Sequence, residues 1–235
     1  MSSNLNFWKP IVGESWYNNC QNIFDNDYMG KVMSFLVNAY KTSTVYPLQK
    51  NVFKPFILTP FDKVRVVIIG TEPYTTSNGD VPTATGLAFA NDEDNINLSP
   101  ELRNIHRAVE LYCYDGLKVN FDITLEEWAE QGVLLLNSSL TVNKYKPGSH
   151  SSIWIPFVEE VIKSLNSNTN GLHFVFWGEG ANRFKPLVNG LFHYIYEFES
   201  PSKVKTLNYD WKCTHFKDTN MNIMQQHGFQ EVIAW

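Results

Sequence analysis

Side chains that can do chemistry follow four apolar runs of the sequence, each directly after the run ends. They are Thr71 and Glu72, Asn137, Gly178 and Glu179, and Ser200 and Ser202. A carboxylate can orient a water molecule or stabilise a developing cation, and a side-chain amide offers a donor and an acceptor together. These residue types predict a polar site and leave its substrate open.

The four apolar runs are predicted to be buried β-strands. The first, Val64–Ile69, is rich in β-branched residues and stops at Gly70. The other three are Val133–Leu136, Leu172–Trp177 and Tyr194–Phe198. Because the carboxyl ends of parallel strands lie at one edge of an open sheet, the polar residues are expected to meet in one cleft there.

The segments around these strands are predicted to be helical. The expected helices are 1–40, Ser99 to about Tyr114, Leu125–Gln131, Ile155–Leu165, a helix from about Ala181, and Asp218–His227. Ser99 precedes Pro100 and Glu101, which is a typical helix start. Alternation of strands and helices predicts an α/β fold, one domain over 1–235, with a central four-stranded, mostly parallel sheet flanked by helices.

Composition limits the classes of partner. The chain has 235 residues, 43% of them hydrophobic, and a net charge of −5. Any nucleic-acid binding must therefore rest on local positive charge. Three cysteines without CxxC spacing argue against a disulfide framework or a zinc site. No signal peptide or membrane-spanning run is visible. We expect a cytoplasmic monomer in a reducing compartment, without a membrane partner, metal or cofactor.

Short motifs along nearly the whole chain resemble family 1 uracil-DNA glycosylases. GTEPY stands where that family has GQDPY, SPELRNI where it has PPSLxNI, and SPSKV where it has HPSPL. YPLQKNVFKPF resembles the family's YPPQKDVFNAF type of segment, and GLAF, QGVLLLNSSLTV, FWG and CTHF also match. The resemblance implies the glycosylase fold and DNA, single- or double-stranded, as the partner.

The departures from the family pattern are concentrated at the site. Glu72 replaces the family's water-activating Asp, Thr71 its base-contacting Gln, and Ser200 the His that donates to the departing base. Glu101 and Glu179 replace serines that contact phosphates, so they place acids where a polyanion binds. They repel DNA there unless they turn away or cap helix N-termini.

The resemblance assigns roles to the residues at matching positions. Glu72 and Ser200 would be catalytic, through a water or sugar cation and through the leaving base. Base binding would fall to Thr71, Tyr74, Phe89 and Asn137: Asn137 would read the flipped base, Phe89 would stack on it, and Tyr74 would exclude substituents at C5. DNA contacts would come from Ser202, Lys203, Val204 and Lys205. Structural alternatives stay open: a solvated acid for Glu72, core packing for Phe89, a packed turn for Tyr74 and a loop cap for Asn137.

Two functions are compatible with this pattern. The first is a DNA glycosylase that hydrolyses the N-glycosidic bond of a flipped non-standard or modified pyrimidine and leaves an abasic site. Segment 75–85 is about four residues longer than in the family and rich in hydroxyls. Such a loop could bind a polar C5 group, as in modified phage DNA, or be a tolerated surface loop. The second function is a catalytically inactive homologue that binds DNA or protein.

Overall fold

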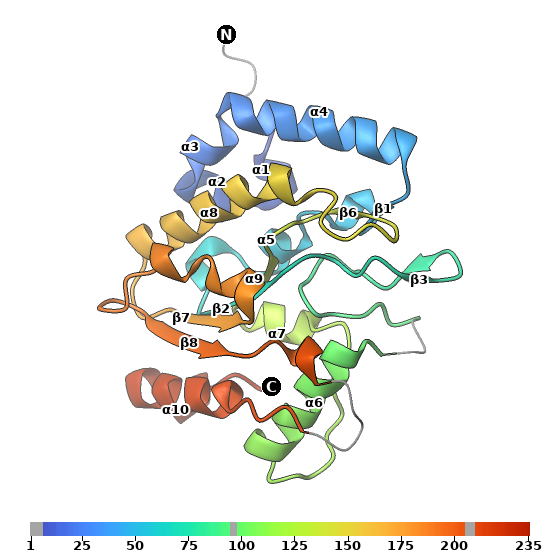
Figure 1. Ribbon diagram of the computed structural model, residues 1–235. Coiled ribbons are helices and arrows are strands. Elements are labelled where there is room, and N and C mark those ends of the chain that lie inside the picture. Colours follow the sequence, from blue (N-terminus) through green and yellow to red (C-terminus); the bar gives the residue numbers. More distant parts are fainter. Residues whose placement is uncertain (1–6, 95–97, 205–209) are drawn as a thin grey trace.

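A four-stranded sheet lies at the centre of the chain (Figure 1). The structure is a computed structural model that describes residues 7–94, 98–204 and 210–235. The strands are β2 (Val66–Gly70), β5 (Val133–Asn137), β7 (His173–Trp177) and β8 (Tyr194–Phe198). They are ordered β5–β2–β7–β8, and all three pairings are parallel. The α/β prediction is confirmed, and each strand lies within two residues of its predicted bounds.

The pleat of the strands divides the core into two hydrophobic clusters. Successive strand residues point to opposite faces of a sheet. Val67, Ile69, Leu134, Leu136, Phe174 and Phe176 belong to one cluster. Val66, Ile68, Val133, Leu135, Val175 and Trp177 belong to the other. Because both faces are apolar, helices must cover both.

Helices form a layer on each face of the sheet, above and below it in Figure 1. The first layer, over Val67 and Ile69, contains α1 (Lys9–Val12), α2 (Glu14–Asn19), α3 (Gln21–Phe24), α4 (Asp27–Thr42), α5 (Lys54–Leu58), α8 (Ser151–Asn168) and α9 (Glu179–Asn182). The second layer, over Val66 and Ile68, contains α6 (Pro100–Cys113), α7 (Glu126–Glu130) and α10 (His215–His227). Within the described part of the chain, no helix combines the length and the apolar character needed to cross a membrane.

Helix boundaries differ from the predictions in four places, one of which is α10, which begins at His215 and not at Asp218. The helical segment 1–40 is divided into α1–α4, and Gly13, with a φ of +86°, ends the first of them. Helix α8 begins at Ser151, four residues before the expected Ile155, and contains Pro156 in its interior. Helix α9 is a single turn. Helix α6 begins as predicted, with the Ser99 Oγ accepting a hydrogen bond from the Leu102 N–H at 3.3 Å.

Two small antiparallel pairs lie outside the central sheet. Strand β1 (Val45–Tyr46) pairs with β6 (Val142–Asn143). Strands β3 (Ser77–Asn78) and β4 (Val81–Pro82) form a hairpin within the long segment 75–85. The hairpin extends away from the sheet, at the right of Figure 1. The extra residues therefore pair with one another.

Candidate active site

A cavity of about 280 Å³ opens at the carboxyl edge of the central sheet. Its lining comes from the loops after β2, β5 and β8, from the start of α6 and from the segment before α8. The lining residues are Thr71, Glu72, Pro73, Tyr74, Thr75, Phe89, Glu101, Asn137, Pro147, Ser200 and Ser202. Every predicted catalytic and base-binding residue is among them, so the structure brings these side chains together.

Asn137 occupies the floor of this cavity at the end of β5. It is 3% exposed. Its partner in the sheet register is Gly70, and a Cβ on Gly70 would lie 2.4 Å from Asn137 Oδ1. Glycine at 70 therefore leaves the space that the amide fills. The amide makes no hydrogen bond within the described parts of the chain, so its donor and acceptor remain available to a ligand.

Tyr74 and Phe89 form one wall, and hydrogen bonds join them. Tyr74 Oη donates to the Phe89 carbonyl at 3.2 Å and accepts from Ser99 Oγ at 2.7 Å. Phe89 has a φ of +67° and packs edge-on against Trp177, with ring centroids 5.5 Å apart. Burial raises the pKa of Tyr74, so the phenol stays protonated. These contacts fix the tyrosine in the wall of the cavity.

Glu72 is held by the backbone of a distant loop. Its Oε2 accepts a hydrogen bond from the Gly148 N–H at 2.7 Å. That loop is anchored in turn by the Asn143 N–H, which donates to Ser149 Oγ at 2.9 Å. A carboxylate with one oxygen fixed in this way keeps its other oxygen for a water molecule or for a cationic sugar.

Ser200 is engaged within its own turn. Its Oγ lies 2.8 Å from Ser202 Oγ and accepts from the Ser202 N–H at 3.3 Å. The turn begins the short 3₁₀ helix Pro201–Lys203. A Cβ on Gly178 would lie 2.8 Å from Ser200 Cβ, so glycine after β7 permits this approach. Ser200 Oγ accepts from the Ser202 N–H, and either hydroxyl can donate in the contact between Ser200 and Ser202, so one of the two O–H groups stays free.

Thr71 lies at the cavity mouth and is fixed through its backbone. Its carbonyl accepts from Ser138 Oγ at 2.6 Å and from the Ser139 N–H at 3.1 Å. A Cβ on Gly180 would lie 2.7 Å from Thr71 Oγ1, so the turn of α9 packs directly on this side chain. The residue as a whole is exposed and lines the cavity.

The predicted DNA-contact residues divide into two groups. Ser202 and Lys203 are exposed beside the cavity. Val204 is 7% exposed and belongs to the second cluster, so it would have to leave this packing to enter a DNA stack. Lys205 lies outside the described residues. Glu101 lines the cavity, and Glu179 is exposed in the first turn of α9.

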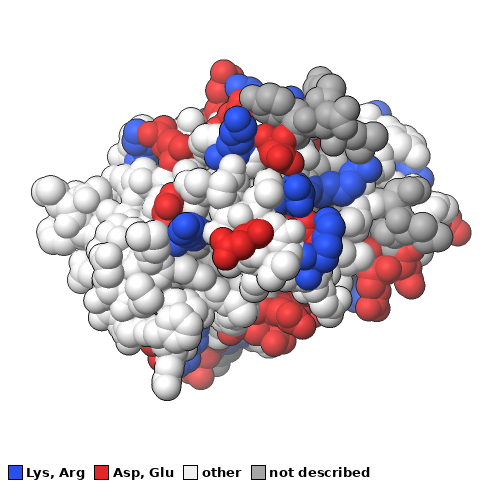
Figure 2. All heavy atoms as spheres, turned by 90° about the horizontal axis from the view of Figure 1, so that it is seen from below, with Lys and Arg blue, Asp and Glu red and all other residues white. Residues whose placement is uncertain are grey.

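Charge on the neighbouring surface is mixed. Figure 2 shows the face that carries α6 and α10, where Lys and Arg side chains lie among Asp and Glu side chains. On this face no large field of one sign surrounds the described residues. This agrees with the modest net charge of −5.

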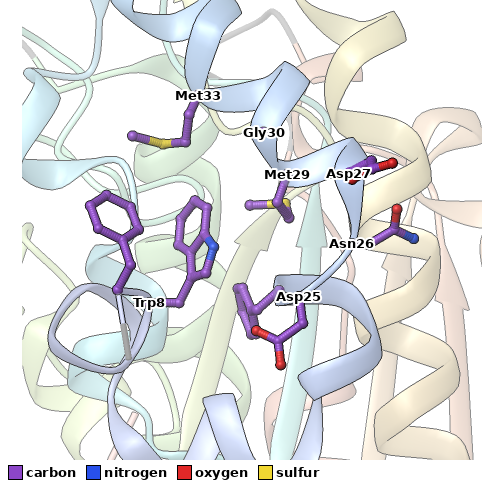
Figure 3. A pocket seen from close by; sticks show the side chains of 9 residues that line it. Trp8, Asp25, Asn26, Asp27, Met29, Gly30 and Met33 are labelled. Carbon is purple, nitrogen blue, oxygen red and sulfur yellow. The ribbon is translucent and has the colours of Figure 1, made fainter. Parts of the chain in front are cut away.

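A larger hollow of about 370 Å³ lies in the N-terminal helices (Figure 3). Trp8, Met29 and Met33 face it, and Asp25 and Asp27 lie at its border. Asp25 accepts hydrogen bonds from the Tyr17 hydroxyl. None of these residues lies at a strand end, so the cavity at the sheet edge remains the candidate site.

Comparison with known proteins identifies the family. The profile of the Uracil DNA glycosylase superfamily matches residues 56–223. A uracil-DNA glycosylase of Fusobacterium nucleatum is 35% identical over 233 residues, which cover 99% of this chain and 96% of the relative. The chain belongs to the uracil-DNA glycosylase superfamily. A uracil-DNA glycosylase of Streptococcus equi subsp. zooepidemicus is 36% identical over 94% of this chain and 98% of its own length.

Solved structures of the superfamily share the fold. The crystal structure of mimivirus uracil-DNA glycosylase superposes with a TM-score of 0.83 at 24% identity, and covers 96% of this chain and 87% of the viral chain. A Y322L form of the same viral enzyme, solved in complex with UGI, also has a TM-score of 0.83. At this level of identity the likeness establishes the fold alone.

Two contributors to the site were missed by the sequence analysis. Gly148 binds Glu72 from a position 76 residues away along the chain. Ser99 was identified as a helix cap, but its contact with Tyr74 was not foreseen. Ser99 stands where the family motif PPSLxNI has its first proline. This replacement is the signal that could have indicated a second role for Ser99.

Proposed function

We propose that this superfamily member is a DNA glycosylase that acts through a single domain on a flipped pyrimidine and leaves an abasic site. One observation carries the proposal: Glu72, Phe89 and the unpaired amide of Asn137 converge on one cavity. A carboxylate, an aromatic platform and a polar reader are what hydrolysis of a flipped base requires.

Each side chain has one step in the proposed reaction. Phe89 stacks on the flipped base, and Asn137 hydrogen-bonds its polar edge. Glu72 orients a water molecule, or stabilises the cationic sugar, as the bond from C1′ to the base nitrogen breaks. The base nitrogen keeps the electron pair of that bond and takes up a proton from solvent after it departs. The water oxygen bonds to C1′, and the proton of the water passes to Glu72 or to solvent. Ser200 faces the leaving base with a hydroxyl in place of an imidazole.

The weaker donor at Ser200 moves the proposed specificity away from plain uracil. Uracil leaves as an anion, and removing one well-aimed donor to developing charge typically costs ~10²–10³ in rate. For a non-standard pyrimidine that is a better leaving group, the missing donor lowers the rate of release by a smaller factor. Activity against modified phage DNA belongs to this proposal as one class of substrate.

The conformation of segment 75–85 bears on how such a modification would be bound. Of segment 75–85, only Thr75 lines the cavity, and the rest forms the β3–β4 hairpin. Tyr74 is held in place by Ser99 and by the Phe89 carbonyl. A C5 group of a modified phage cytosine would therefore have to be accommodated beside Tyr74 and Thr75 and not by the hairpin.

A catalytically inactive DNA- or protein-binding homologue is the alternative function. One observation favours it: Glu101 lines the cavity where the family's motif has a phosphate-binding serine. An acid there weakens DNA binding by repulsion. If the protein cleaves the N-glycosidic bond of any base, this alternative is excluded.

Substrate panels test the proposed function. Single-stranded oligonucleotides with uracil or modified pyrimidines, and phage DNA with modified cytosines, are incubated with the protein, and abasic sites are counted after alkaline cleavage. We expect uracil release far slower than by the Fusobacterium relative, and faster release of at least one modified pyrimidine. Background cleavage of every substrate would leave the inactive homologue as the function.

A further inference from the structure

The turn that follows β8 is anchored at both ends by side chains from other parts of the chain. At its start, the Glu199 carbonyl accepts a hydrogen bond from Trp211 Nε1 at 3.0 Å. At its far end, Asn104 of α6 donates from Nδ2 to the Pro201 carbonyl at 2.7 Å and to the Val204 carbonyl at 3.1 Å. The backbone between these anchors is therefore fixed, and so are the positions from which its side chains extend.

Two groups of Ser202 contact the hydroxyl oxygen of Ser200 within this turn. The Ser202 N–H donates to Ser200 Oγ at 3.3 Å, and Ser202 Oγ lies 2.8 Å from the same atom. A serine hydroxyl has two lone pairs and one proton. If Ser202 donates both its N–H and its O–H, both lone pairs of Ser200 are used and the Ser200 proton is left over. Both serines line the cavity, so a base bound there can accept a hydrogen bond from that proton.

A departing base sets the direction of the contact between the two hydroxyls. Negative charge develops on the base as its bond to C1′ breaks, and that charge attracts the nearest O–H dipole. Hydrogen bonds in a chain polarise one another, so a hydroxyl that accepts two of them is a stronger donor than an isolated one. No Lys, Arg or His side chain is among the described lining residues, so the cavity stabilises this charge through neutral donors.

We propose that Ser202 is a positioning residue for departure of the base: it donates to Ser200 Oγ, turns the Ser200 O–H toward the base and strengthens it as a donor. The proposal rests on the proposed glycosylase function and adds a residue that acts through Ser200. Neither serine loses its proton in this step. The base nitrogen keeps the electron pair of the broken bond and is protonated by solvent afterwards. A phosphate contact by Ser202, as the motif resemblance implies, would instead change the affinity for DNA.

The test compares the release of uracil and 5-fluorouracil from single-stranded DNA in single turnovers with saturating protein. The fluorine stabilises the departing anion, so 5-fluorouracil depends less on a donor. Ser202→Ala should slow uracil release about tenfold, less than the ~10²–10³ that loss of a whole donor costs. The ratio of 5-fluorouracil to uracil release should then rise about threefold. Any contact of Tyr74 with the fluorine is common to all variants and cancels from the comparison.

Three variants complete the test. Ser200→Ala should raise the ratio at least as much as Ser202→Ala, and the double variant should match Ser200→Ala, because Ser202 acts through Ser200. Ser202→Thr keeps the hydroxyl and should keep the wild-type ratio. Ser202 is exposed, so its variants should fold as the wild type does.

The outcomes separate the proposal from the glycosylase function. An unchanged ratio in Ser202→Ala, with or without weaker DNA binding in fluorescence anisotropy, would overturn the positioning role and leave the glycosylase function standing. Faster uracil release by Ser202→Ala would do the same, since it would mean that Ser202 accepts the Ser200 proton. Release of neither base by wild type would overturn both.

Discussion

The Tyr74 hydroxyl donates a hydrogen bond to the Phe89 carbonyl at 3.2 Å, and so joins the C5 wall of the cavity to its aromatic platform. Phe89 has a φ of +67°, a conformation that is costly for a bulky side chain. The contact helps to hold that conformation. Ser99 completes the arrangement by donating to Tyr74 while it caps α6.

Ser99→Ala should affect stability and specificity together. Loss of the cap is expected to lower the free energy of unfolding by about 1 kcal/mol. Loss of the donor to Tyr74 should let the Tyr74 side chain move more freely. The release of C5-substituted pyrimidines should then rise relative to that of unsubstituted ones. Urea unfolding and base-release ratios measure the two effects. Ser99→Thr keeps the hydroxyl and is the control. Wild-type stability and discrimination in Ser99→Ala would refute the coupling.

Gly70→Ala should displace the base-reading amide. The new Cβ would lie 2.4 Å from Asn137 Oδ1 and 2.9 Å from Ala88 Cβ, distances that force a shift. We expect a loss of about 1–3 kcal/mol in the free energy of unfolding and a large drop in base release. Gly30→Ala is the matched control, because nothing lies within 4 Å of its Cβ in α4. Full activity of a stable Gly70→Ala protein would show that Asn137 does not read the base.

Stability should fall with acid because of His173. Burial, followed by the nearby charges of Arg65 and His227, lowers the pKa of this imidazole from 6.5 to about 4. The unfolded chain therefore binds a proton between these values that the folded chain does not. Stability is fully present above pH 6.5 and is lost as the pH falls towards 4, by up to about 3 kcal/mol.

His173→Phe isolates this contribution. The replacement ring can stack on Tyr194, whose ring lies 4.6 Å from that of His173, and Tyr196 keeps its bond from Asn222. Urea unfolding at several pH values should show a shallower decline below pH 6.5 for the variant. Parallel declines in the two proteins would mean that His173 is not the titrating group.

DNA binding should depend weakly on salt. Lys203 is the described cation of the predicted contact segment, and the net charge is −5. About two neutralised phosphates give a slope of about −1.4 in log K against log salt for single strands. Lys203→Ala should reduce the magnitude of this slope by about 0.7. Lys31 lies in α4 on the other side of the sheet, so Lys31→Ala is the control and should leave the slope unchanged. A slope several times steeper would indicate a basic groove elsewhere.

Much of the fold could be predicted because its signals are local. Apolar β-branched runs such as Val66–Ile69 and a capping serine before Pro100 determine structure within a few residues. The start of α8 was placed too late: the helix begins at Ser151, and Trp154 in its first turn and Phe157 pack in the first cluster on either side of Pro156. The β3–β4 hairpin has only two paired residues in each strand, too few for a clear alternating pattern.

The site could be predicted only as a set of residues. Strand ends indicated Glu72, Asn137 and Ser200, and their convergence followed from the parallel sheet. The contact between Glu72 and Gly148 joins positions that share no local pattern, so no sequence signal indicates it. Burial of Val204 likewise depends on packing against α6, from which Asn104 donates a hydrogen bond to its carbonyl at 3.1 Å.

The most direct test of a Glu72-dependent glycosylase is the single-turnover rate of base release by wild type and Glu72→Gln, on whichever oligonucleotide of the panel is cleaved fastest. The amide is nearly isosteric and can still accept from the Gly148 N–H, so unfolding curves should coincide. We predict that release falls by at least about 10²-fold in Glu72→Gln. Equal rates in the two folded proteins, or no release by wild type, would contradict the account.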